Sequence, residues 1–157
     1  MGVRPAHCYT KISGPANTRT KKYVRGVPGN KIVMYDMGHK SKEFEIDLHL
    51  VNSEACQIRH MSIEASRQVV NRALQKTLSR DEYHFRIRIH PHHVLRENKM
   101  MAFAGADRMQ DGMRRSFGKP TDRSARVKVN SEILTVSVDL KHFEDAKNSL
   151  RKARITF

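Results

Sequence analysis

The residues best suited to chemistry form two small groups. Three histidines surround Pro91, at positions 90, 92 and 93, and two carboxylates, Asp107 and Asp111, stand four positions apart. Imidazoles bind zinc and carboxylates bind magnesium, so a metal-dependent RNA-processing enzyme is one hypothesis. However, Pro91 breaks the histidine spacing, and the arginines near the aspartates favour salt bridges or RNA contacts. We therefore expect no metal site, no cofactor and no catalytic residue.

Other familiar catalytic and compartment signals are missing from the sequence. It contains no P-loop, dinucleotide-binding, nucleophile-elbow or zinc-protease motif. Cys8 and Cys56 are too few for a disulfide framework, so we expect two thiols in a reducing cytosol. No apolar run approaches the roughly 20 residues of a membrane helix, and the first residues do not resemble a signal peptide. We expect a cytoplasmic protein without a membrane partner or a homo-oligomeric state.

The charge of the chain indicates a polyanionic partner. Its 157 residues include 30 Lys and Arg against 16 Asp and Glu, a net charge of +14. The excess lies in two blocks, with residues 1–42 at +8 and residues 83–128 at +7, separated by residues 43–82 at −2. Such an uneven basic distribution is typical of proteins that bind nucleic acid. A basic adaptor for an acidic protein or a membrane surface remains the alternative.

Hydrophobic periodicity predicts the elements that must position these charges. Apolar residues at helical spacing predict helices over 62–78, with Ser62 as N-cap, and over 142–153. Alternating or β-branched runs predict strands over 31–37, 44–50, 83–90, 92–95, 126–129 and 133–138, with a short last strand at 155–157. The runs 126–129 and 133–138 should form a hairpin. We expect one domain over 1–157, an α+β fold with a mostly antiparallel sheet and two helices packed on it.

The strand predicted over 83–90 places positive groups in a row. Tyr83, Phe85, Ile87 and Ile89 should face the core, and His84, Arg86, Arg88 and His90 should face outward. Successive side chains on one face of a strand are about 6.6 Å apart, close to the phosphate spacing in RNA. The outward row could therefore bind phosphates. The alternative is that it pairs with acidic side chains across the sheet.

Two segments lack regular periodicity. Residues 1–30 form an irregular basic arm, interrupted by glycines and prolines, which we expect to be disordered without a partner. Residues 98–120 contain three glycines and a proline and exceed the usual length of a loop in a compact domain. With Arg108, Arg114 and Arg115 in it, this long loop is suited to reach into RNA.

Short motifs occur in a fixed order along almost the whole chain. They span residues 4–9, 23–28, 31–32, 36–38, 86–91, 93–96, 98–100, 104–108, 112–114 and 117–120, and include RIRIHP, AGADR and FGKP. Together they resemble a large-subunit ribosomal protein family called L ten-e in archaea and eukaryotes, the counterpart of bacterial L sixteen. The segment HVLRENK at 93–99 looks like the archaeal branch.

This resemblance implies an α/β-hammerhead-type fold that binds large-subunit rRNA near the central protuberance. It also implies that the loop at about 100–119 points toward the peptidyl transferase centre and helps to position tRNA, while RNA performs the chemistry. The implied partners are large-subunit rRNA, with 5S rRNA nearby, tRNA and neighbouring ribosomal proteins.

Charge and resemblance together select two sets of site residues. The set expected to bind rRNA comprises Arg4, Lys11, Arg19, Lys21, Lys22, Arg25, Arg86, Arg88, Arg96, Lys99, Arg123 and Arg126. The set expected in the loop near tRNA comprises Arg108, Met109, Gln110, Asp111, Gly112, Met113, Arg114 and Arg115.

Overall fold

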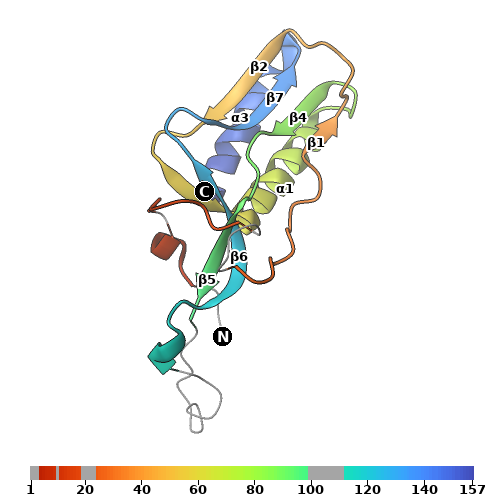
Figure 1. Ribbon diagram of the computed structural model, residues 1–157. Coiled ribbons are helices and arrows are strands. Elements are labelled where there is room, and N and C mark those ends of the chain that lie inside the picture. The colour runs from red at the N-terminus through yellow and green to blue at the C-terminus, as the bar shows by residue number, and fades with distance from the viewer. Residues whose placement is uncertain (1–3, 10, 19–23, 99–111) are drawn as a thin grey trace.

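Two antiparallel sheets carry the fold (Figure 1). The computed structural model describes residues 4–9, 11–18, 24–98 and 112–157. One sheet has the strand order β1-β4-β7-β2 and the other the order β3-β6-β5. The strands are β1 (Asp36–Gly38), β2 (Ile46–Val51), β3 (Cys56–Arg59), β4 (Tyr83–Ile87), β5 (His93–Glu97), β6 (Lys119–Val127) and β7 (Glu132–Val138). The predicted α+β fold with antiparallel strands is confirmed.

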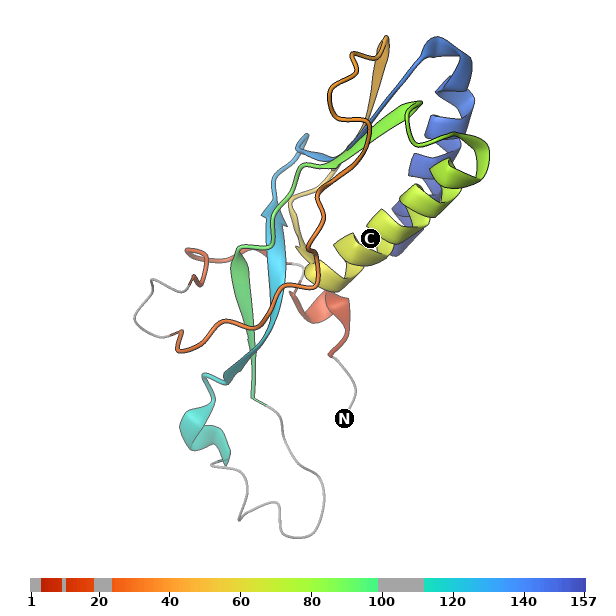
Figure 2. The ribbon, with the colours of Figure 1, turned by 90° about the vertical axis from the view of Figure 1, so that its right-hand side faces the viewer.

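Two helices, α1 (His60–Thr77) and α3 (Phe143–Ala153), pack on the same face of the four-stranded sheet (Figure 2). The predicted alternation of strand 83–90 holds, because Tyr83, Phe85 and Ile87 are buried in the core. The two helices contact each other, and each buries small side chains completely, among them Ser66 on α1 and Ala146 on α3. None of the described helices combines the length and apolar character needed to cross a membrane.

Several predicted boundaries are wrong for local reasons. Of the strand predicted over 31–37, only Asp36 and Met37 belong to β1. Val33 and Met34 are 83% and 55% exposed. Helix α1 begins at His60 rather than after Ser62, because the unpredicted strand β3 runs directly into it. The predicted last strand 155–157 is instead mostly a 3-10 turn, Arg154–Thr156.

The predicted hairpin 126–138 is also wrong. Strand β6 pairs with β3 and β5, whereas β7 pairs with β2 and β4, so the chain changes sheets between them. Asn130 adopts a positive φ of 60° at this crossing, and its N–H donates to the Asn52 carbonyl over 2.8 Å. The predicted strand 92–95 likewise belongs to the three-stranded sheet and does not extend β4.

The long loop starts and ends on one ladder. Strands β5 and β6 pair as far as Glu97 opposite Lys119, so both ends of the loop leave the same end of the sheet. Gly118 closes this base with φ +76°, and a Cβ there would lie 2.7 Å from the carbonyl carbon of Glu97. Lys119 and Pro120, predicted as loop, are the first residues of β6.

We predict that Gly118→Ala lowers the free energy of unfolding by about 3 kcal/mol, since it combines left-handed backbone strain with a backbone clash. Gly26→Ala is the matched control, because Gly26 has φ +77° but a Cβ added there would meet no atom within 4 Å. The control should lose only about 1 kcal/mol. Urea unfolding of both variants provides the measurement, and equal losses would contradict the proposed clash.

Candidate nucleic-acid interface

Side chains of the three-stranded sheet donate hydrogen bonds to backbone carbonyls of the basic arm. Arg126 donates from Nη1 to the Gly14 carbonyl over 2.7 Å and from Nη2 to the Ser13 carbonyl over 3.3 Å. In the same way Arg59 Nη1 reaches the Arg4 carbonyl over 2.8 Å. Hydrogen bonds from a charged donor are stronger than neutral ones. The described parts of the arm therefore have partners within the protein, contrary to the expected disorder.

Two further hydrogen bonds join the arm to strand β5. The Asn17 N–H donates to His93 Nδ1 over 2.9 Å, and the Asn17 carbonyl accepts from the Val94 N–H over 2.9 Å. His93 is only 6% exposed. Burial lowers the pKa of His93 to about 4, and the positive charges of Arg126, His92 and Arg96 act in the same direction. His93 is therefore neutral at neutral pH, as its acceptor role requires.

A buried polar cluster lies where β3 runs into α1. His60 Nε2 donates to the Asp122 carboxylate, and His60 Nδ1 accepts from the Lys31 N–H over 3.3 Å. Arg59 Nε lies 3.2 Å from the same carboxylate. Burial lowers the pKa of His60 despite the opposing effect of Asp122, so the ring stays neutral between its two partners. Sequence reasoning missed this cluster, because its members belong to three distant segments.

Four guanidinium groups of the three-stranded sheet share an unusual feature. The Nε atoms of Arg59, Arg96, Arg123 and Arg126 are buried, with no hydrogen-bond partner among the described residues. Arg59 at least has an ionic neighbour in Asp122. The Arg96 guanidinium stacks on Phe117, 3.1 Å from the ring centroid, and burial lowers its pKa. The fold therefore holds four guanidinium charges on one small sheet at a cost of about 1–3 kcal/mol for each buried donor without an acceptor.

The outward row on β4 is only partly available. The side chains of Arg86 and Arg88 are 54% and 39% exposed. Arg86 Nε lies 3.5 Å from Asp36, and Arg88 Nε lies 3.4 Å from Glu132. Pairing with acids across the sheet, the alternative considered from the sequence, is thus what the structure shows. Both arginines face away from the core, but a neighbouring carboxylate neutralises part of the charge of each.

The remaining predicted residues differ in how they can be placed. Arg4, Lys11 and Arg25 are exposed on the arm. Met113 and Arg114 are exposed in a 3-10 turn over Gly112–Arg115. The residues that lie outside the described part of the chain are Arg19, Lys21, Lys22, Lys99, Arg108, Met109, Gln110 and Asp111.

The histidine cluster is dispersed rather than convergent. His90 lies against Tyr35 with ring centroids 4.4 Å apart, His92 is exposed, and His93 is buried beneath the arm. Within the described ranges, no three His, Cys, Asp or Glu side chains are grouped to hold a metal ion. Cys8 and Cys56 are free thiols. Asp107 and Asp111 lie outside the described residues.

The chain is similar to known proteins over almost its whole length. Residues 12–157 match the family model described as ribosomal protein L16p/L10e. The large ribosomal subunit protein uL16 of Staphylothermus marinus is 50% identical over 153 residues, covering 98% of this chain and 87% of that protein. The protein of that name from Hyperthermus butylicus is 46% identical, covering 97% and 87%. The one from Methanococcus aeolicus is also 46% identical, covering 99% and 89%.

We predict that Arg126→Ala releases the arm, because it removes both guanidinium bonds to the Ser13 and Gly14 carbonyls. Amide hydrogen exchange in residues 11–18 should accelerate, with a local loss of about 1–3 kcal/mol. Lys128→Ala is the control, since Lys128 is exposed two residues farther along the chain. Unchanged exchange in Arg126→Ala would show that the arm is held by other contacts.

We predict that acidification loosens the same arm. The pKa of His93 is about 4 in the folded protein against about 6.5 in an unfolded chain, so the unfolded state binds more protons between these values. Stability is therefore lost as the pH falls from about 6.5 toward 4, by about 1–2 kcal/mol at pH 5. Hydrogen exchange at Asn17 should report the loss. In His93→Gln this pH dependence should be reduced, and an unaltered pH profile would contradict the assignment.

Proposed function

The chain belongs to the ribosomal protein L16p/L10e family, and on this premise we propose that it binds large-subunit rRNA through its arm and three-stranded sheet and contacts tRNA through the 100–119 loop. Its relatives are proteins of the large ribosomal subunit. The chain is accordingly a ribosomal protein of that subunit and not an enzyme. Its place is the ribosome, where rRNA and other ribosomal proteins are its partners.

The observation that carries the rRNA proposal is the concentration of arginines on one small sheet, where three of them form no ion pair with a described carboxylate. These are Arg96, Arg123 and Arg126, whose positive charge has no anionic partner among the described residues. Phosphate and ribose oxygens are acceptors that match guanidinium groups well. Exposed Arg4, Lys11 and Arg25 on the adjoining arm extend the same positive surface. Folded RNA would therefore supply what this part of the protein lacks.

Docking of the arm supports the same proposal. Because Arg59 and Arg126 hold backbone carbonyls of the arm, exposed cations such as Lys11 are displayed from a fixed backbone. A segment that is already ordered loses less conformational entropy when it binds. We propose that the arm meets rRNA largely in this docked arrangement.

The tRNA contact is proposed for residues 108–115. The ladder between Glu97 and Lys119 anchors both ends of the loop, and Arg96 stacks on Phe117 at its base. Exposed Met113 and Arg114 lie just beyond this base. In this proposal the whole chain acts as one domain, with 5S rRNA nearby, and the loop positions tRNA near the peptidyl transferase centre while RNA performs peptide-bond formation.

Salt titration of binding to large-subunit rRNA tests the proposal. The logarithm of the binding constant should fall with the logarithm of salt concentration by about 0.7–0.9 per neutralised phosphate. Replacing Lys11 and Arg25 together by alanine should make this slope shallower by about 1.4–1.8, since both are exposed on the arm. The control replaces Arg151 and Lys152, exposed on the outer side of α3, and should change the slope little.

Two outcomes would count against the proposal. A wild-type slope near zero would show that phosphate contacts do not drive binding. For the loop, Arg114→Ala in reconstituted subunits should weaken tRNA binding and leave rRNA binding intact, because Arg114 is exposed and away from the core. Equal tRNA affinity with and without the substitution would remove Arg114 from the tRNA contact.

A further inference from the structure

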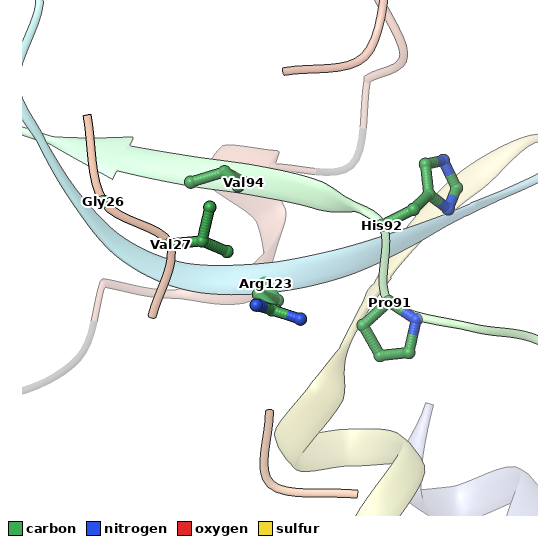
Figure 3. Close-up of a pocket in the computed structure, with 6 residues that line it drawn as sticks. All are labelled: Gly26, Val27, Pro91, His92, Val94 and Arg123. Carbon is green, nitrogen blue, oxygen red and sulfur yellow. The ribbon is translucent and has the colours of Figure 1, made fainter. Parts of the chain in front are cut away.

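A pocket separates the second half of the arm from strands β5 and β6. Gly26 and Val27 line it from the arm, Pro91, His92 and Val94 from the β5 side, and Arg123 from β6 (Figure 3). Its volume is about 530 Å³, within the range of pockets that hold small organic ligands. Val24, 5% exposed, anchors the arm segment that forms the wall. The pocket therefore depends on the arm being docked.

The lining combines one accessible apolar side chain with an unbalanced positive charge. Val27 supplies accessible apolar surface, whereas Val94 is only 1% exposed and Pro91 is buried. Figure 3 shows Arg123 between the two valines and Pro91. Arg123 Nε is buried without a hydrogen-bond partner, and no described carboxylate forms an ion pair with its guanidinium. The neighbouring Asp122 carboxylate is engaged by Arg59, His60 and the backbone N–H of Arg123. An anionic group is therefore the missing partner of Arg123.

His92 adds a second polar function to the pocket. Its Nδ1 lies 3.0 Å from the His90 carbonyl. A carbonyl can only accept, so Nδ1 carries the proton, and Nε2 of the neutral ring is left as an acceptor. Such an atom suits a hydroxyl or amino group. The ligand that matches the lining has a negative charge, a hydrogen-bond donor and a small apolar part that can contact Val27.

We propose that this pocket receives one nucleotide extruded from the folded rRNA. Its base packs against Val27, its phosphate pairs with Arg123, and His92 Nε2 accepts from the ribose or the base. Bases splayed out of the helix are the usual targets of specific recognition in RNA. A free phosphate would leave Val27 uncovered, and an ionised acidic side chain would offer no hydrogen-bond donor to His92 Nε2. The inference rests on the proposed binding of rRNA.

Chemical probing of each nucleotide tests the inference, using the full chain bound to large-subunit rRNA. The wild-type protein should protect one nucleotide that becomes reactive again, at least threefold, in both Arg123→Ala and Val27→Asp. Arg123→Ala should also make the salt slope shallower by about 0.7–0.9, the contribution of one phosphate. Val27→Ser, which removes the apolar contact without adding charge, should expose the same nucleotide and leave the salt slope unchanged.

Arg25→Ala is the matched control, because Arg25 is an exposed cation of the same arm segment that does not line the pocket. It should weaken binding through the salt slope while the protected nucleotide stays protected. Hydrogen exchange of residues 24–30 verifies that the arm remains docked in each variant. If wild-type protein binds rRNA but no nucleotide responds to both pocket substitutions, the inference is wrong. Crosslinking of the pocket to an acidic protein segment would also overturn it. Failure of the wild-type protein to bind rRNA would contradict the proposed function itself.

Discussion

The arrangement of the basic surface depends on hydrogen bonds from sheet side chains to the backbone of the arm. Arg59, Arg126 and Gln57 donate to carbonyls at residues 4, 11, 13 and 14, and His93 accepts from Asn17. A backbone without these partners would have to remain solvated, because burying an unpaired polar group destabilises the fold. Because the ties are made to the backbone, the arm can present its own cationic side chains outward.

Neutral histidines make this arrangement compatible with a chain of net charge +14. His60 and His93 are both buried, and burial lowers the pKa of each. A protonated ring at either place would lose its acceptor nitrogen and add charge beside arginines. The protein thus concentrates arginine on a small sheet while its buried imidazoles remain uncharged, which limits repulsion within the sheet.

Hydrophobic periodicity in the sequence was sufficient to predict the helices and strands that bury one regular face. Helical spacing located α1 and α3 within two residues at their starts, and alternation located β2 and β4. It failed for β3, which has only four residues, and for the partner of β6, because adjacency in sequence does not reveal which sheet a strand joins. Charge identified Arg123 and Arg126 as cations. It could not show that Arg126 holds the arm, since that bond joins residues more than a hundred positions apart.

The ladder at the base of the long loop has a consequence for how this segment can vary. Glu97 and Lys119 are paired, and Gly118 completes the closure, so the sheet ends in the same way whatever lies between. Each doubling of a flexible loop costs only about 0.6 kcal/mol in closure entropy. Insertions or deletions between these two anchors are therefore thermodynamically inexpensive. The reach of the segment can be tuned almost independently of the stability of the rest of the molecule.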